Sequence, residues 1–335
     1  MWQQYSHNGP VSKHPYFVYT PASYHVGTAV PLVVMLHGCG QTTIDFANGT
    51  AMNILAEQHG FIVVYPQQTG VHNRGLCWNW FLPAHQSRGH GEPASIVGIV
   101  RDIQQNSTHW TIDATRIYVA GLSAGAAMAV ILGATYPDLF AAIGIHSGVE
   151  YRAATNLNDG LKVMRRGGPD PHQQGLAAYT AMSDLARIVP TIVFHGTKDT
   201  TIAPVNGDQL VQQWMETDHL ASHNTYSPNF TQPTNVTSGQ APGGYTYVIA
   251  TWNATNEQAV QAYWKINGLG HAWSGGSPIG TFTDPRGPNA SLALYNFFMA
   301  HTLGKSAAQH IATQAKLRHI LADLFKVKWV KKEQK

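Results

Sequence analysis

The amino-acid sequence predicts an α/β fold in which a mostly parallel sheet carries helices on both faces. Two features support this prediction. Short runs of β-branched and other apolar residues recur along the chain, and segments of helical length and character lie between them. Runs that stay apolar over four to six residues are typical of strands buried on both faces. Strands that alternate with helices favour parallel pairing, because each helix returns the chain to the start of the next strand.

The strands and helices are expected at definite places along the chain. The expected strands, bounded by Gly, Pro or Asp, cover 31–38, 60–67, 115–121, 140–148, 190–196 and 259–268. The expected helices cover 43–60, 93–107, 126–140, 205–218 and 290–304. Residues 149–189 are less regular, with a loop expected at 165–175, and a surface loop is expected at 224–244. No linker divides the body, so residues 1–304 are expected to form one domain.

Composition excludes several classes of protein. Hydrophobic residues make up 44% of the 335 residues and charged residues only 12%, which excludes a disordered chain. The 32 glycines and 18 prolines exclude a coiled coil, and two cysteines are too few for a disulfide scaffold or a structural zinc site. The 18 histidines are scattered. His219 and His223 have i, i+4 spacing but no nearby third ligand, so we expect surface histidines and no metal site.

Charge is distributed unevenly along the chain. The tail 305–335 holds eight of the 21 Lys and Arg but only two acidic residues, so its charge is about +6. The body carries a net negative charge and is not expected to bind nucleic acid. Apolar residues at nearly helical spacing in the tail predict a basic amphipathic helix. This helix is expected to dock on the body, a partner or an anionic surface.

Membrane and targeting signals are not expected. The run 117–136 has no charge and the length of a membrane span, but it contains three glycines and divides into a strand pattern and a helix pattern. A buried strand–turn–helix unit explains it better than a membrane helix. The first ten residues contain no apolar region of the kind that signal peptides have, so no signal peptide is expected in this chain.

A G-x-S-x-G pentapeptide at 121–125 is the strongest sign of chemistry. It follows the strand-like run at 115–121 and precedes a helix-like segment, which is the context of the nucleophile elbow in α/β-hydrolases. The sharp turn strains the serine and brings two backbones close together, and only small residues, such as the glycines at 121 and 125, leave room for that. Ser123 is therefore the predicted nucleophile. The N-terminus of the following helix favours the negative charge that develops beside it.

A serine nucleophile needs a base that a carboxylate orients. In α/β-hydrolases the order along the chain is Ser, acid, His, each on a loop after a strand. Asp199 directly follows the strand-like run at 190–196 and is the predicted acid, while Asp208 is a rival that lies in a helical segment. His271, on a glycine-flanked loop after the run at 259–268, is the predicted base. Three other candidates that end strands are interpreted as structural residues: His37, His195 and Ser147.

The oxyanion hole is expected from two backbone N–H groups. One belongs to Ala124, the residue after the nucleophile, and the other to the loop that follows an early strand. Residues 37–41, with the sequence HGCGQ, form that loop, and Cys39 would donate its N–H. A catalytic thiol is the competing interpretation of Cys39. It is disfavoured because no elbow or separate acid–base partner accompanies this cysteine.

Five motifs, spread over roughly residues 14–303, are similar to those of a known family. They are PLVVMLHGCGQT, CWNWF, GLSAGAAM, HGTKDTTIAPVNG and GLGHAWSGG. In this order they resemble the poly(3-hydroxybutyrate) depolymerase-like esterase family, which is related to the feruloyl and acetylxylan esterases of carbohydrate esterase family one. The resemblance implies an α/β-hydrolase fold and a serine esterase with Ser123, Asp199 and His271 as the triad. It also implies secretion and no cofactor.

The resemblance implies further features of the site. It suggests that the loops holding Cys39 and Cys77 meet, so a disulfide between them is expected, with two unpaired buried thiols as the alternative. Aromatic residues near the triad are expected to offer a flat apolar surface to the substrate: Trp78 and Trp273 first, then Trp80, while core packing is expected for at least one aromatic residue, Trp80 or Phe81 before the others.

The expected function is hydrolysis of carboxylic esters through an acyl-enzyme. Short-chain polyesters such as poly(3-hydroxybutyrate) are the first expected substrates, and aryl or acetyl esters of plant polysaccharide are the second. An extracellular location is expected, although the absence of a signal peptide leaves a cytoplasmic location open. A hydrolase fold without activity that serves only for binding is the alternative of another class. The presence of serine, acid and base together argues against it.

Overall fold

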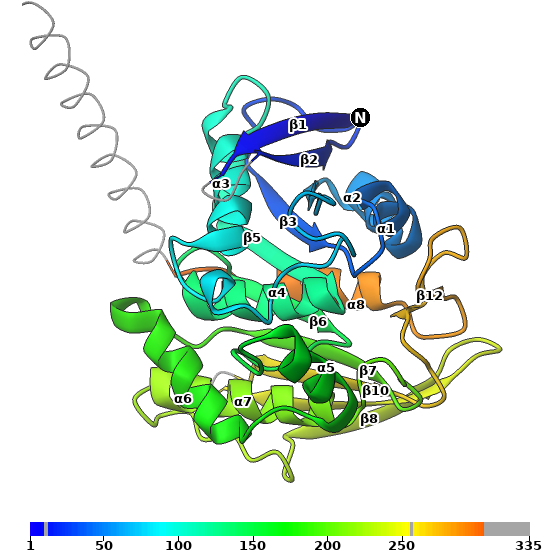
Figure 1. The fold of residues 1–335 in the computed structure, drawn as a ribbon. Coiled ribbons are helices and arrows are strands. Elements are labelled where there is room, and N and C mark those ends of the chain that lie inside the picture. The colour runs from blue at the N-terminus through cyan, green and yellow to red at the C-terminus, as the bar shows by residue number, and fades with distance from the viewer. Residues whose placement is uncertain (10–12, 255–256, 305–335) are drawn as a thin grey trace, which may run out of the picture.

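A ten-stranded mixed sheet forms the centre of the computed structural model, which describes residues 1–9, 13–254 and 257–304 (Figure 1). The strands lie in the order β1-β2-β4-β3-β5-β6-β7-β10-β9-β8. Their bounds are Trp2–Asn8 (β1), Lys13–Tyr19 (β2), Val30–Leu36 (β3), Ile62–Pro66 (β4), Ile112–Leu122 (β5), Ala142–His146 (β6), Thr191–Gly196 (β7), Asn235–Gln240 (β8), Thr246–Asn253 (β9) and Ala259–Ile266 (β10).

The centre of the sheet is parallel and its margins are antiparallel. Strands β4, β3, β5, β6, β7 and β10 pair in parallel, in that order. The β1–β2 ribbon adds to β4 on one side, and the β9–β8 ribbon adds to β10 on the other. The six parallel strands are those that the apolar runs predicted, so the α/β prediction is confirmed. Parallel strands end at one common edge, and this edge receives the loops that follow β3, β5, β7 and β10.

Helices cover both faces of the sheet. The helices are α1 (Thr43–Thr50), α2 (Met52–His59), α3 (Gly91–Gln105), α4 (Ala124–Thr135), α5 (Leu157–Arg166), α6 (Pro171–Met182), α7 (Val205–Ala221) and α8 (Ala290–Met299). Helices α3, α4, α6 and α7 supply the core on one face, and α1, α2 and α8 supply it on the other. Strand β3 shows how both cores arise from one apolar run, because Val34 contributes to the first core and its neighbour Met35 to the second.

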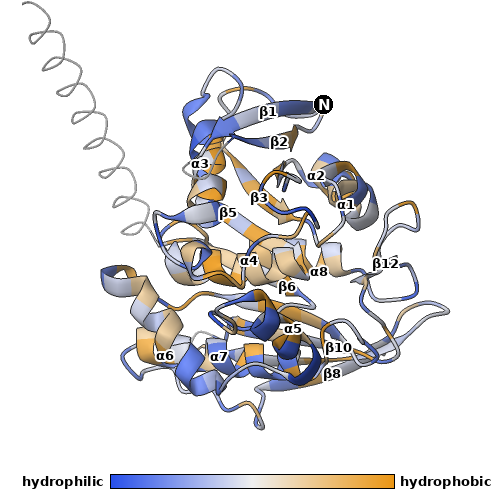
Figure 2. Cartoon of the chain, viewed as in Figure 1, coloured by the Kyte–Doolittle hydropathy of each residue, from blue (hydrophilic) through white to orange (hydrophobic). Residues whose placement is uncertain are grey.

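The most hydrophobic helix lies at the centre. All twelve residues of α4 are buried, which matches its continuous apolar sequence, and Figure 2 colours it as hydrophobic along its length. A helix that is apolar on every side must be covered on every side. Helix α4 is accordingly enclosed between β5, α3 and α6.

The structure corrects the expected elements at three places. The surface loop expected at 224–244 contains strand β8, which pairs with β9 at the margin of the sheet. The segment 43–60 is two helices rather than one, because Ala51 between them has a left-handed backbone with φ of +53°. The loop expected at 165–175 is limited to 167–170, since α5 continues to Arg166 and α6 begins at Pro171. The Asp170 carboxylate accepts the N–H of His172 and caps α6. The Asp–Pro pair therefore begins a helix here, a role that suits both residues.

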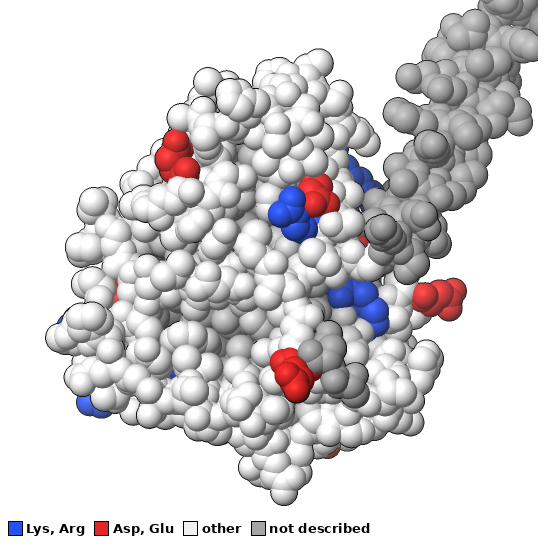
Figure 3. Space-filling model, turned by 180° about the vertical axis from the view of Figure 1, so that it is seen from behind, with Lys and Arg blue, Asp and Glu red and all other residues white. Residues whose placement is uncertain are grey.

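Two further expectations concern a membrane span and the basic tail. In the described part of the chain, no helix has the length and apolar character needed to cross a membrane. On the face drawn in Figure 3, charged side chains are few and scattered among uncharged ones, with one basic and one acidic side chain side by side. The basic tail expected at 305–335 lies outside the described residues.

Glu150, in the loop that follows β6, is a buried carboxyl group that forms no ion pair with another described residue. Its side chain is 3% exposed, and neither carboxyl oxygen has a hydrogen-bond partner among the described residues. Burial, together with the nearby charge of Asp170, raises the pKa of Glu150 to about 8. The carboxyl group is therefore protonated at neutral pH.

Glu150→Gln is expected to stabilise the fold increasingly as the pH rises from about 4.5 to about 8. The unfolded chain loses this proton near pH 4.5 and the folded chain only near pH 8, so the wild type loses stability across this window. Between pH 5 and pH 8.5, the free energy of unfolding of the variant should rise, relative to that of the wild type, by on the order of 3 kcal/mol. Urea unfolding of both proteins at the two pH values measures this change. An equal difference at both pH values would contradict a protonated Glu150.

Candidate active site

Ser123 lies in a strained turn between β5 and α4. Its φ is +58° and its ψ is −119°, a conformation that residues other than glycine rarely adopt. The two glycines of the motif explain why the turn is possible. A Cβ at Gly121 would lie 2.4 Å from the carbonyl carbon of Gly125, and a Cβ at Gly125 would lie 2.1 Å from the carbonyl oxygen of Leu36. The glycines therefore let α4 start directly against β5 and β3, with Ser123 at its first turn.

His271 and Asp199 are hydrogen-bonded at the same edge of the sheet. The distance from His271 Nδ1 to Asp199 Oδ2 is 2.8 Å, and both side chains lie on the loops that follow the adjacent strands β10 and β7. The other carboxylate oxygen of Asp199 accepts the N–H groups of Thr201 and Ile202. Burial opposes the ionisation of Asp199, but the hydrogen bond and charge of His271 outweigh it, so its pKa lies below the usual value. Asp199 is thus an anion that holds the Nδ1–H of His271 and leaves Nε2 as the basic nitrogen.

The rival acid, Asp208, has other partners. Its carboxylate accepts the hydroxyl of Tyr263 at 2.9 Å and pairs with the ammonium group of Lys265 at 2.7 Å. Two histidines interpreted as structural are enclosed. His195 donates its Nε2–H to the carbonyl of Ile202, and burial lowers the pKa of His37 to about 4. The side chains of these two histidines support the loops around the site and stay neutral at pH 7.

The loop 37–41 passes directly beside Ser123. A Cβ on Gly38 would lie 3.4 Å from the Cβ of Ser123. Cys39 forms a disulfide with Cys77, which ties this loop to the segment that contains the CWNWF motif. Within the described part of the chain, the Cys39 N–H has no protein acceptor, whereas the N–H groups on either side of it are bonded to Gln41 and Gly75. Two N–H groups therefore remain for a ligand beside the serine, that of Cys39 and that of Ala124, the first residue of α4.

Comparison with known proteins agrees with this geometry. The family model described as Esterase PHB depolymerase matches residues 14–225, a range that includes Ser123 and Asp199 but ends before His271. The chain belongs to this esterase family.

Sequence relatives of this esterase family act on several ester classes. Poly(3-hydroxyalkanoate) depolymerase C of Paucimonas lemoignei is 34% identical over 251 residues, covering 74% of this chain and 55% of that protein. Feruloyl esterase B of Neurospora crassa is 30% identical, covering 59% and 68%. A probable acetylxylan esterase A of Neosartorya fischeri is 31% identical, covering 64% and 58%. The chain thus spans about half the length of the depolymerase.

A solved structure shares the fold. The acetyl xylan esterase from Aspergillus awamori has a TM-score of 0.65 and 24% identity, and the match covers 81% of this chain and 94% of that one. The α/β-hydrolase fold expected from the motifs is therefore confirmed.

The expected aromatic platform is wrong in this structure. Trp78 is 0% exposed, Trp273 1% and Trp80 6%, so these side chains belong to the core of the esterase fold. The reason is that the indole N–H groups find internal acceptors. Trp78 donates to the carbonyl of His37, and Trp273 donates to the hydroxyl of Ser291. Trp78 thus supports the loop 37–41 from beneath.

An exposed aromatic side chain that sequence reasoning missed lies beside His271. The ring of Phe282 meets the imidazole edge to face, with centroids 6.3 Å apart, and Phe282 is 50% exposed. Two other large apolar side chains face solvent on the segments that meet here, Ile279 at 79% on the same loop and Ile44 at 51% next to Asp45, which bonds to Thr281. We call Ile44, Ile279 and Phe282 the apolar rim. The only signal in the sequence is that Phe282 follows a Gly- and Pro-rich stretch just after the His271 motif.

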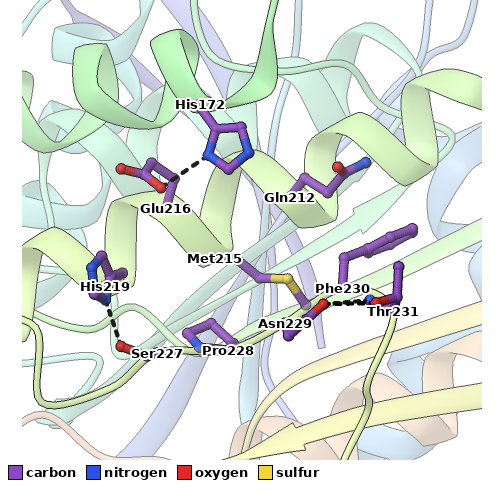
Figure 4. Close-up of a pocket in the computed structure, with 10 residues that line it drawn as sticks. All are labelled: His172, Gln212, Met215, Glu216, His219, Ser227, Pro228, Asn229, Phe230 and Thr231. Atoms are coloured by element: carbon purple, nitrogen blue, oxygen red, sulfur yellow. Dashed lines mark hydrogen bonds and ion pairs between the residues drawn. The ribbon is translucent and has the colours of Figure 1, made fainter.

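A separate hollow of about 410 Å³ lies between α6, α7 and the segment 227–231 (Figure 4). Its polar side chains already have partners, since His172 pairs with Glu216 at 3.0 Å and His219 meets the hydroxyl of Ser227 at 3.0 Å. Ser123, Asp199 and His271 do not line it. In residues 1–9, 13–254 and 257–304, no group of three or more His, Cys, Asp or Glu is arranged to hold a metal ion.

Proposed function

We propose that the chain is a serine carboxylic-ester hydrolase with Ser123 as nucleophile, His271 as base and Asp199 as the acid that orients the base. The observation that carries this proposal is the 2.8 Å bond between His271 and Asp199 at the edge of the sheet where the elbow presents Ser123. The bond fixes the tautomer in which Nε2 is free to accept a proton. Membership in an esterase family supports the same reaction.

The reaction follows from these groups in two steps. His271 Nε2 takes the proton of the Ser123 hydroxyl while Oγ attacks the ester carbonyl carbon. The bond to the leaving alcohol then breaks, and the imidazolium returns the proton to the alcohol oxygen. Water attacks the acyl-enzyme with His271 again as base, which releases the acid and restores the serine.

The charge on the carbonyl oxygen is stabilised by the N–H groups of Cys39 and Ala124. Both belong to backbone that is already fixed before substrate arrives, Cys39 by its disulfide and Ala124 by the start of α4. Prearranged donors stabilise the transition state without the cost of reorganising around it. The proposed reaction uses no cofactor.

The proposed substrate class is a water-insoluble polyester of hydroxy acids. The apolar rim supports it, because Phe282 contacts His271 and two further large side chains face solvent on the adjoining segments, which favours contact with an apolar solid. The depolymerases of Paucimonas lemoignei and Ralstonia pickettii among the relatives support the same class. Feruloyl and acetylxylan esters are the alternative, which the other relatives favour. The Cys39–Cys77 disulfide supports an extracellular location.

Ser123→Ala is expected to lower kcat for p-nitrophenyl butyrate by roughly 10⁴–10⁶-fold, because the nucleophile is lost and only the other groups of the site remain. Thermal unfolding should be almost unchanged, since the hydroxyl is not part of the core packing. A variant that keeps a tenth of the wild-type activity would exclude Ser123 as the nucleophile.

Asp199→Asn is expected to lower kcat on the order of 10⁴-fold, because an amide in place of the carboxylate favours the wrong tautomer of His271. Asp208→Asn is the matched control, since it makes the same change in a carboxylate that bonds to Tyr263 and Lys265. Steady-state kinetics on one soluble ester compares the two. Greater damage from the Asp208 variant would assign the acid to Asp208 instead.

The double variant Ile44→Ser/Ile279→Ser is expected to lose at least about tenfold more activity on poly(3-hydroxybutyrate) film than on p-nitrophenyl butyrate. Each isoleucine buried against the polymer contributes about 1.5–3 kcal/mol, whereas a small soluble ester is expected to contact Phe282 at most and neither isoleucine. Leu176→Ser, which changes an equally exposed side chain on α6, is the control. Equal losses on film and soluble ester would favour the feruloyl or acetylxylan alternative.

A further inference from the structure

Gln41, in the loop beside Ser123, uses both ends of its side-chain amide. The residue is 1% exposed. Its Oε1 accepts the N–H of Gly38 at 2.9 Å, and its Nε2 donates to the carbonyl of Thr281 at 2.9 Å and to the carboxylate of Asp45 at 3.1 Å. Residues 41 and 281 are 240 positions apart in sequence. One buried side chain thus joins two loops that the chain order does not bring together.

On one side, Gln41 fixes the direction of the Cys39 N–H. That N–H belongs to the same peptide unit as the Gly38 carbonyl, so in a trans peptide the two groups point in opposite directions. The Gly38 carbonyl is held away from solvent by His37 Nδ1 at 2.8 Å and by the backbone N–H of Gln41 at 3.3 Å. The side chain of Gln41 holds the Gly38 N–H, which belongs to the preceding peptide unit, so the two peptide units that meet at Gly38 are both fixed by Gln41.

On the other side, Gln41 holds the loop that carries Phe282. Thr281 donates its backbone N–H and its hydroxyl to Asp45, and its carbonyl accepts from Gln41. The next residue, Phe282, accepts the N–H of Trp273 at 2.7 Å, which pairs the loop with the segment that follows His271. The position of the Phe282 ring against His271 therefore depends on the contact among Gln41, Asp45 and Thr281.

We propose that Gln41 is a positioning residue that sets the oxyanion N–H of Cys39 and the Phe282 loop at a fixed distance from one another across Ser123. The proposal rests on the proposed ester hydrolysis. The oxyanion side of Gln41 acts on the transition state of every ester. The loop side acts on the binding of esters long enough to reach Phe282, so Gln41 and Asp45 together determine which acyl or alcohol group fits.

The two sides can be separated by two variants. Gln41→Leu breaks both sides and leaves the buried Gly38 N–H without an acceptor, while Asp45→Ala breaks only the loop side. Gln209→Leu is the matched control, because Gln209 also bonds backbone through both ends of its amide, at Gly168 and Pro169 on a different loop. The readouts are kcat and KM for p-nitrophenyl acetate and p-nitrophenyl octanoate, and hydrogen exchange of the amides in 279–282.

For Gln41→Leu, kcat should fall about tenfold or more on both esters, because a displaced oxyanion donor weakens transition-state stabilisation. For Asp45→Ala, KM for the octanoate should rise about tenfold more than KM for the acetate, while kcat falls less on both esters than in Gln41→Leu. Exchange of the amides in 279–282 should increase in both variants and not in Gln209→Leu. This pattern supports the proposal.

Other outcomes overturn it. If Gln41→Leu alters only thermal stability, as Gln209→Leu is expected to do, Gln41 is a structural residue and the proposal is wrong. If the wild type hydrolyses neither ester, the proposed function fails, and hydrogen exchange then decides the inference by itself. Unchanged exchange in 279–282 in Gln41→Leu overturns the link between the loops, and increased exchange supports it.

Discussion

The approach of α4 to β3 is the contact on which the rest of the site depends. Gly125, in the first turn of α4, lies so close to the carbonyl of Leu36 that a methyl group at this position would overlap the oxygen. Because β3 and β5 are neighbours in the sheet, the same approach places the loop after β3 beside the elbow after β5. This one approach therefore accounts both for the strained backbone of Ser123 and for the position of the 37–41 loop beside it. The packing of α4 on all sides holds the strain in place.

The 37–41 loop is held by a second layer of polar contacts, which converge on Glu92. This side chain is fully buried at the start of α3, and it accepts from Gln68 and twice from Asn79. Gln68 in turn donates its backbone N–H to the ring of His37 and its amide to the carbonyl of Cys77. The disulfide thus forms between two segments whose positions are already set by hydrogen bonds. Removing one of these contacts would leave others in place, which is how a loop without regular structure stays rigid.

The sequence predicted the framework of the molecule better than its surface. The six parallel strands follow from apolar runs, since burial on both faces leaves a strong local pattern. The same holds for Ser123, because the elbow needs glycines at fixed spacing. The aromatic residues were misplaced, because Trp78 or Trp273 has the same sequence context whether its indole faces substrate or core. Phe282 was missed because its place depends on bonds between Asp45 and Thr281, which are 236 residues apart. Contacts between residues so far apart in the chain leave no periodic pattern in the sequence.

The few acidic residues explain why the rim can be apolar. Several of the 18 carboxylates lie inside the molecule, where they hold backbone and side chains rather than solubilise the surface. Asp199 orients His271, Glu92 fixes the 68–79 segment, and Asp218 accepts from Val189 and Gln261. Their pKa values differ because their partners differ. Burial raises the pKa of Glu92 to about 7 and that of Asp218 to about 8, whereas the hydrogen bond and charge of His271 outweigh burial and lower that of Asp199. Asp199 therefore stays ionised beside His271. Because charged residues are only 12% of the chain and part of them is internal, few charges remain to cover the surface, and large apolar side chains such as those of the rim stay exposed.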